Sequence, residues 1–234
     1  MSGVDGAPYL APVPWFPLPA RLAVLLSGRG SNFEALAAAC ARGELPARIV
    51  LVLADRADAA GLEKASALGL RSQLEERRAG EARSAHEERL AGHLEAAGTD
   101  IVCLAGFMRV LSSAFVARFE RRIVNVHPSL LPAFPGLHTH RRALEAGVKL
   151  HGATVHLVTP ALDSGPIVAQ AAVPVLAGDT EETLSQRVLA AEHRIYPQAV
   201  RWLVEERLEV LGDVVRIRGA GVGTDCIVSP RDPS

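Results

Sequence analysis

An asparagine and a histidine stand two residues apart at the end of a short apolar segment, at Asn125 and His127. Side chains at positions i and i+2 of an extended segment point to the same side. The two polar groups should therefore face one pocket, while Val124 and Val126 face the opposite layer. An amide donor beside a titratable imidazole suits a carbonyl whose oxygen gains negative charge during reaction. The spacing therefore predicts a site for chemistry at a carbonyl group.

The residues that follow this pair place it at the end of a strand. Pro128, Pro132 and Pro135 come directly after it, and proline cannot continue a central strand because it has no backbone N–H. Open α/β sheets bind ligands at the carboxyl ends of their strands. A lone histidine at a strand end is often only a satisfied polar residue, so the neighbouring amide is what favours a catalytic role.

A second motif, Leu-Ser-Gly-Arg-Gly-Ser-Asn at positions 26–32, joins the first apolar run to the first helical pattern. Its glycines let a ligand approach the backbone closely, and the free amides at a helix start favour an anion. The motif is not a Walker A loop, and Phe33 stands where a dinucleotide-binding fingerprint needs a third glycine. We expect the backbone of Gly30, Ser31 and Asn32 to bind phosphate, with a purely structural turn as the alternative.

The third candidate is Asp163, in the turn Leu-Asp-Ser-Gly-Pro at positions 162–166. A carboxylate among glycine and proline residues is commonly only a turn former. Close to His127, however, it would stabilise the protonated imidazole and could hold water for proton transfer. Whether the two side chains meet depends on the fold, so both interpretations stay open at this point.

Other reactive residue types lack the spacing that their usual chemistry requires. The histidines include His138 and His140 in a His-x-His pattern, but no HExxH motif and no nearby cysteine accompany them. Because a metal site needs three or four converging ligands, we predict no metal. No serine lies in a GxSxG motif, which argues against a serine hydrolase. The three cysteines, interpreted as core thiols, are Cys40, Cys103 and Cys226.

The elements that position these residues follow from the apolar pattern. From residue 21 onward, short apolar runs alternate with helical patterns, which predicts buried parallel strands joined by helices. The strands expected in the first half are residues 22–26, 49–54, 100–105 and 123–127. The helices expected between them are residues 32–42, 60–68, 81–97 and 113–119.

The pattern changes after Pro128. A short helix is expected at 139–146, and the strands at 153–158 and 167–175 should pair antiparallel because only a short loop separates them. A long helix at 179–207 is expected to begin with Asp179 as its cap and Glu182 closing a capping box, and a hairpin follows at 208–217. The sequence thus predicts an α/β fold: a Rossmann-like open sheet, mostly parallel in the first half, with antiparallel strands added in the second half and helices on both faces.

The 234 residues, of which 49% are hydrophobic and 22% charged, fit an ordinary globular protein. We expect one domain over residues 21–218, a flexible proline-rich extension at 1–20 and a tail at 219–234. The formal net charge of −1 gives no basic field for nucleic acid. No apolar run approaches the roughly 20 residues of a membrane span, and no secretory signal is recognisable, so we expect no membrane partner and a cytoplasmic location. The sequence is compatible with a monomer or a homodimer.

Several motifs together make the sequence resemble the phosphoribosylglycinamide formyltransferase family of the folate-dependent formyltransferase superfamily. They are SGRGSN at 27–32, ADAAGLE at 57–63, LAGFMRVL at 104–111, NVHPSLLP at 125–132, PGLHTH at 135–140, LDSGP at 162–166 and EHRIYP at 192–197. They cover about residues 21–207 in family order. The resemblance implies an enzyme that transfers the formyl group of 10-formyltetrahydrofolate to the amine of glycinamide ribonucleotide in purine (IMP) biosynthesis.

The resemblance also implies a catalytic trio of Asn125, His127 and Asp163. The amine would attack the formyl carbon directly, while Asn125 and protonated His127 donate to the resulting oxyanion. Asp163 would keep His127 charged and, with an ordered water, carry the proton of the amine toward the folate nitrogen. The family turn often reads Asp-Gly-Gly, whereas Ser164 follows the aspartate here.

Ligand contacts follow from the same resemblance. Gly30, Ser31 and Asn32 would bind the substrate phosphate, and Glu192 would reach the sugar or glycinamide part of that substrate. The residues expected to contact the folate are Arg83, Met108, Arg109, Val110, Leu111, Asn125, Thr159, Pro160, Ala161, Leu162 and Asp163.

Four other functions share part of these features. Formyltetrahydrofolate deformylase is the main alternative, but that family typically has an N-terminal regulatory domain and a second histidine where Pro128 stands here. Methionyl-tRNA formyltransferase has a further C-terminal tRNA-binding domain, for which we expect the residues after 218 to be too few. A non-catalytic folate- or nucleotide-binding protein would not need the whole trio, and fold alone does not establish activity. A nicotinamide-dependent oxidoreductase would need the third glycine.

Overall fold

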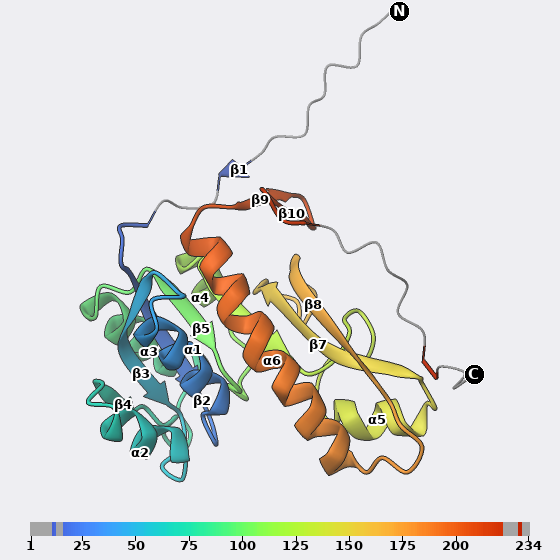
Figure 1. Ribbon diagram of the computed structural model, residues 1–234. Coiled ribbons are helices and arrows are strands. Elements are labelled where there is room, and N and C mark those ends of the chain that lie inside the picture. The colour runs from blue at the N-terminus through green and yellow to red at the C-terminus, as the bar shows by residue number, and fades with distance from the viewer. Residues whose placement is uncertain (1–10, 13–15, 222–228, 231–234) are drawn as a thin grey trace, which may run out of the picture.

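The computed structural model describes residues 11–12, 16–221 and 229–230. A ten-stranded sheet runs through the molecule in the order β1-β9-β10-β8-β7-β6-β5-β2-β3-β4, and helices cover both of its faces (Figure 1). Residues 1–10 and 13–15 of the expected extension, and residues 222–228 and 231–234 of the expected tail, lie outside the described residues. No helix in the described ranges is long and apolar enough to cross a membrane.

The first half of the chain forms the parallel part of the sheet. Its strands are β2 (Ala20–Leu26), β3 (Ala47–Ala54), β4 (Ser72–Leu74), β5 (Ile101–Leu104) and β6 (Ile123–His127). They pair parallel in the order β4-β3-β2-β5-β6. The strands predicted from apolar runs are therefore confirmed. β4 is an addition, because its Ser-Gln-Leu sequence contains no apolar run that could predict it.

Helices pack on both faces of this half (Figure 1). Their bounds are α1 (Ser31–Ala41), α2 (Ala60–Ala67), α3 (Arg83–Ala96) and α4 (Ser113–Arg118). β2 shows how one strand serves two cores. Leu22, Val24 and Leu26 pack into the core that contains the buried side chains of α1, while Ala23 and Leu25 join the core that contains those of α3 and α4. This alternation is the two-residue period of a strand buried on both sides.

The second half adds antiparallel strands to the sheet. Its elements are α5 (Thr139–Glu145), β7 (Leu150–Leu157), β8 (Ile167–Pro174), α6 (Glu181–Val204), β9 (Leu208–Leu211) and β10 (Val214–Ile217). β7 pairs antiparallel with both β6 and β8, and β9 and β10 form the predicted hairpin. The predicted α/β fold, mostly parallel at first and antiparallel later, is confirmed.

The N-terminal cap of α6 differs from the prediction. The hydroxyl of Thr180 accepts from the backbone N–H of Thr183 at 3.2 Å, and the hydroxyl of Thr183 accepts from the backbone N–H of Thr180 at 3.0 Å. The predicted cap, Asp179, is engaged elsewhere: it pairs with Arg187 at 2.8 Å. The prediction of a box made by Asp179 and Glu182 was therefore wrong. The helix begins one residue later than predicted, and the carboxylate of Asp179 is occupied by Arg187 and by the hydroxyl of Thr183.

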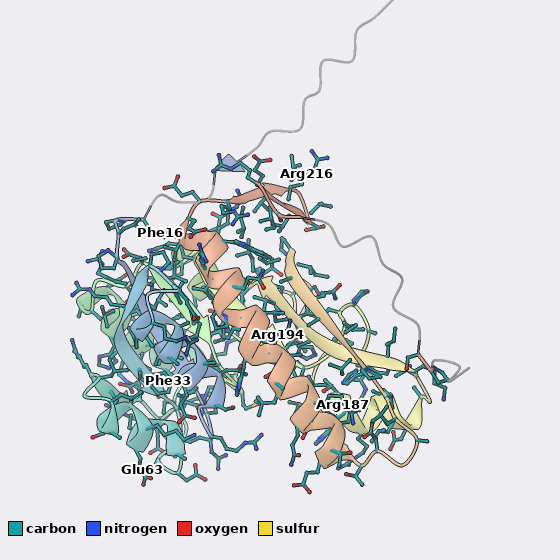
Figure 2. All side chains as sticks on the ribbon, viewed as in Figure 1. Phe16, Phe33, Glu63, Arg187, Arg194 and Arg216 are labelled. Atoms are coloured by element: carbon teal, nitrogen blue, oxygen red, sulfur yellow. The ribbon has the colours of Figure 1, made fainter. Side chains whose placement is uncertain are left out.

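Two parts of the proline-rich segment have defined places in the fold. β1 (Ala11–Pro12) pairs antiparallel with β9 at one edge of the sheet (Figure 1). Phe16 is only 4% exposed and belongs to the core that also contains the buried side chains of α1 and α6 (Figure 2). The expected division into a domain at 21–218, an extension and a tail stays a prediction.

Candidate active site

The carboxyl ends of the parallel strands border a cavity of about 760 Å³. Its wall comes from the loops that follow β2, β5 and β6, from the turn around Asp163, and from one side of α6. Asn125 and His127 both line it, and the side chain of Val124 packs into the core that includes α6. Val126 belongs to that core as well and also borders the cavity between the two polar residues. The predicted shared pocket at a strand end is therefore confirmed.

The imidazole of His127 is buried between two oxygen atoms. Its Nε2 lies 3.0 Å from the carbonyl oxygen of Phe134, and its Nδ1 lies 3.4 Å from Oδ2 of Asp163. Both oxygens accept hydrogen bonds, yet a neutral imidazole carries a hydrogen on only one nitrogen. The side chains of His127 and Asp163 are 7% and 9% exposed, so water screens their interaction weakly. Donation from both ring nitrogens at once would require the doubly protonated imidazolium.

Asp163 reaches His127 because of an unusual backbone conformation. Its φ is +47°, in the left-handed region that aspartate and asparagine tolerate better than most residues. Its Oδ2 also accepts from the backbone N–H of Gly136 at 2.8 Å. This bond ties the turn at 162–166 to the proline-rich loop after β6. The structure thus brings together the two residues whose meeting the sequence left open.

A further histidine, His156, contacts the amide of Asn125. The two residues lie opposite each other in the register of β6 and β7, and Asn125 Nδ2 lies 3.1 Å from His156 Nε2. The other ring nitrogen, Nδ1, lies 3.0 Å from the carbonyl oxygen of Leu157, which can only accept. Nδ1 therefore carries the hydrogen, and Nε2 accepts from the amide of Asn125. Burial lowers the pKa of His156, which keeps the ring neutral.

This contact fixes which way the amide of Asn125 points. His156 takes one hydrogen of Nδ2, and the second hydrogen remains for a ligand in the cavity. Sequence reasoning passed over His156 because its role depends on which strand lies beside β6. Pairing the predicted strands at 123–127 and 153–158 would have been the signal that could reveal it.

The glycine-containing loop has the geometry of an anion site. Gly30 is the N-cap of α1 with a φ of +71°, and a Cβ added there would lie 2.8 Å from the Cα of Gly61. Only glycine fits such a position without strain. Because Gly30 supplies no side-chain cap, the first N–H groups of α1 have no side-chain acceptor at the point where Ser31 and Asn32 line the cavity.

Glu192 projects from α6 beside this loop. The Asn32 side chain donates to its Oε2 at 2.6 Å. One turn later in the same helix, the buried hydroxyl of Tyr196 lies 2.9 and 3.0 Å from carbonyl oxygens of β5 and β6, which anchors this part of α6 over the strand ends. Burial raises the pKa of Glu192 to about 7, although the bond from Asn32 and the charge of Arg29 act in the opposite direction.

Replacing Glu192 with glutamine should therefore stabilise the protein most at alkaline pH. The pKa of this carboxyl group is about 7 in the fold and near 4.5 in the unfolded chain. The stability that the group contributes is therefore complete below the lower pKa, and it is lost as the pH rises through the higher pKa. Glutamine removes this loss and can still accept from Asn32. Melting temperatures from pH 4 to 9 should show a difference between variant and wild type that grows across this window and then levels off. A difference independent of pH would contradict the raised pKa.

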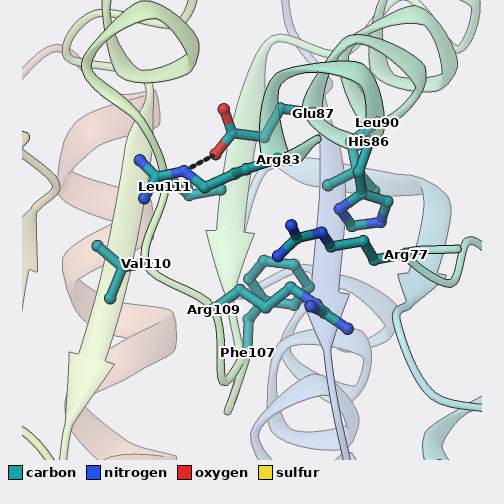
Figure 3. Close-up of a pocket in the computed structure, with 9 residues that line it drawn as sticks. All are labelled: Arg77, Arg83, His86, Glu87, Leu90, Phe107, Arg109, Val110 and Leu111. Carbon is teal, nitrogen blue, oxygen red and sulfur yellow. Dashed lines mark hydrogen bonds and ion pairs between the residues drawn. The ribbon is translucent and has the colours of Figure 1, made fainter. Parts of the chain in front are cut away.

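The residues expected to contact the folate fall into three places. Met108, Arg109, Val110 and Leu162 line the main cavity together with Asn125 and Asp163. Arg83 and Leu111 line a second pocket of about 230 Å³, which shares residues of the 107–110 segment with the main cavity (Figure 3). Thr159, Pro160 and Ala161 contribute to the walls of neither of these two cavities.

The second pocket combines positive charge with apolar surface. Arg77, Arg83 and Arg109 line it; the guanidinium groups of Arg77 and Arg109 lie near the ring of Phe107, and Arg83 lies beside Glu87 (Figure 3). Arg83 is paired with Glu87 at 3.1 Å, and Arg109 is paired with a carboxylate outside this pocket. The pocket therefore suits a flat apolar group that carries a negative charge.

Metal ligation finds no support in this part of the molecule. Across the ranges described above, no group of three or more His, Cys, Asp or Glu side chains could hold a metal ion. His138 and His140 both line the cavity, and the ring of His140 packs edge-on against His151 with 5.4 Å between centroids. The expectation that the protein uses no metal stays a prediction.

Comparison with known proteins decides the family. A family model described as formyl transferase matches residues 20–200. The phosphoribosylglycinamide formyltransferase of Escherichia coli (strain K12) is 44% identical over 190 residues, which are 81% of this chain and 90% of that protein. The chain belongs to the phosphoribosylglycinamide formyltransferase family.

Solved structures place the chain in the same family. The crystal structure of glycinamide ribonucleotide transformylase 1 from Symbiobacterium toebii is 51% identical, with a TM-score of 0.83, and the match covers 85% of this chain and 93% of that one. The formyltetrahydrofolate deformylase of Burkholderia mallei is 29% identical, with a TM-score of 0.77, and the match covers 85% of this chain and 69% of that one. The deformylase was the main alternative from the sequence. This formyltransferase family member is less similar to that deformylase than to the transformylase from Symbiobacterium toebii.

Proposed function

We propose that this family member transfers the formyl group of 10-formyltetrahydrofolate to the amine of glycinamide ribonucleotide in purine biosynthesis. The observation that carries the proposal is the convergence of Asn125, His127 and Asp163 on one cavity. The 44% identity to the E. coli phosphoribosylglycinamide formyltransferase supports the choice of substrates.

In the proposed reaction, the neutral amine attacks the formyl carbon and the formyl oxygen becomes an oxyanion. The free Nδ2–H of Asn125 donates to that oxygen. The Nδ1–H of the His127 imidazolium is shared with it, because the 3.4 Å contact to Asp163 is longer than the roughly 2.7–2.9 Å of a strong charge-assisted bond. Phe134 holds the other side of the ring by accepting from Nε2.

Proton transfer completes the reaction. The carboxylate of Asp163 accepts the proton that the attacking amine loses, either directly or through a water molecule. The proton then passes to the folate nitrogen while the bond between this nitrogen and the formyl carbon breaks. The products are the formylated amine and tetrahydrofolate, and the trio returns to its starting protonation state.

The two substrates would approach this centre from different sides of the cavity. The phosphate of glycinamide ribonucleotide lies on the backbone of residues 30–32, and Glu192 lies beside its sugar or glycinamide part. The pterin of the folate lies against residues 108–111 and Leu162. The acidic end of the folate points into the second pocket, where Arg83 attracts its charge.

An assay that follows both products separates the candidate functions. We expect formylated glycinamide ribonucleotide and tetrahydrofolate to appear in equal amounts, and only when the amine substrate is present. Release of formate in the absence of the amine would instead indicate the deformylase. Binding of either ligand without turnover would contradict the proposed function and indicate a binding protein.

A further inference from the structure

Arg29 is a cation in the glycine-containing loop to which no role has been assigned. It stands between Gly28 and Gly30, is exposed, and lines the main cavity beside Ser31. Within the described ranges it forms no ion pair and no side-chain hydrogen bond. A Cβ added at Gly28 would meet nothing within 4 Å, so the backbone beside Arg29 is open to a ligand.

The charge balance of the cavity gives this arginine its importance. Arg29 and Arg109 are the arginines that line the described cavity, and the guanidinium of Arg109 is already paired with Asp55. Three carboxylates, Asp163, Glu181 and Glu192, also line this cavity. An anion at the start of α1 would therefore share the cavity with acidic groups. Of the two described arginines that line it, Arg29 is the one that forms no ion pair, although its charge reaches Glu192.

A second observation marks this end of the cavity as a site for a polar ligand. The side chain of Asn32 lines the cavity, and the residue is 8% exposed. Its Nδ2 donates to Glu192, but its Oδ1 is buried without a hydrogen-bond partner among the described atoms. Buried polar atoms are nearly always partnered, so the acceptor on Asn32 points to a ligand that carries donors, such as a sugar hydroxyl or an amine.

The backbone alone would bind a phosphate group weakly here. A helix N-terminus offers the equivalent of roughly half a positive charge, whereas a phosphate monoester carries about two negative charges near neutral pH. A guanidinium adds a full charge and donors spaced to bind two phosphate oxygens at once. The side chain of Arg29 therefore changes both the charge balance at the start of α1 and the geometry in which phosphate oxygens can be bound.

We propose that Arg29 binds the phosphate of the amine substrate, closing over an anion held on the backbone of residues 30–32 and making the enzyme selective for the phosphorylated amine. The inference rests on the proposed function, because it takes the substrate from there. It states specifically that the contribution of Arg29 to substrate binding depends on the phosphate group and on no other part of the substrate.

Comparing a phosphorylated and a dephosphorylated substrate tests whether the contribution of Arg29 depends on the phosphate group. Steady-state kinetics are measured for wild type and Arg29→Ala with glycinamide ribonucleotide and with its dephosphorylated counterpart, glycinamide riboside. With the phosphorylated substrate, we expect KM to rise at least about tenfold and kcat to stay within about twofold. With the dephosphorylated substrate, we expect kcat/KM to be the same for both proteins. Arg29→Lys should lie between the two, because it keeps the charge and loses the paired donors.

A matched control and a second readout complete the experiment. Arg42→Ala removes an exposed arginine at the other end of α1, where it pairs with Glu44 outside the cavity, and should change neither substrate. Calorimetric titration of glycinamide ribonucleotide into wild type and Arg29→Ala measures affinity without turnover. Weaker binding by the variant supports the proposal even if formyl transfer is not observed. Equal losses with both substrates, or unchanged affinity for the phosphorylated one, would overturn it.

Discussion

Replacing Asp163 with asparagine should lower kcat by at least about a hundredfold while leaving the fold intact. Asparagine has the same shape and can still accept from the backbone N–H of Gly136, so the turn at 162–166 keeps its tie to the neighbouring loop. It cannot accept the proton of the attacking amine, and it no longer places a negative charge 3.4 Å from Nδ1 of His127. Steady-state kcat at saturating concentrations of both substrates measures the effect.

Two further variants sharpen this prediction. His127→Ala should lose a similar factor, and the double variant should lose little more than either single one, because the two residues act as a unit. Asp58→Asn removes an exposed carboxylate outside the main cavity and should leave kcat unchanged. Near-wild-type turnover of Asp163→Asn would remove this residue from the chemistry.

Most of the fold could be predicted because its main signals are local. A strand buried on both faces needs an apolar run, and β2 supplies one that serves two cores. β4 lies at the edge of the sheet with the sequence Ser-Gln-Leu, so its pairing with β3 comes from the fold and not from its own residues. The cap of α6 was predicted wrongly for a related reason, since Asp179 has a partner that the local sequence does not reveal.

In the candidate site too, the local sequence placed some residues and only the fold places the others. Asn125 and His127 share a strand, so the two-residue period was enough to place them in one pocket. Asp163 reaches His127 through a turn with a φ of +47° and a bond from Gly136, and spacing along the chain reveals neither feature. The sequence made Asp163 a candidate with two open interpretations, and the family resemblance placed it in the trio. His156 depends on the register between β6 and β7, so neither the local pattern nor the trio pointed to it.

Replacing Asn125 with alanine should lower kcat by about 10²–10³-fold, the usual cost of losing one oriented donor to an oxyanion. The amide is suited to this role because His156 accepts one of the two Nδ2 hydrogens. The amide is planar, so this bond also fixes the direction of the second hydrogen. No reorientation is then needed as charge develops on the formyl oxygen. KM should change much less than kcat, because the donor matters most in the transition state.

His156 provides the test of how Asn125 acts. If the imidazole works by orienting the amide, His156→Ala should lower kcat by a smaller factor than Asn125→Ala, and the double variant should be no slower than Asn125→Ala alone. His156→Gln should recover part of the activity, because its amide oxygen can accept from Nδ2 as the ring does. Melting temperatures are needed for each variant, since His156 is buried and its loss can also weaken the sheet. Losses of kcat that multiply in the double variant, with the fold intact, would mean that His156 contributes independently of Asn125.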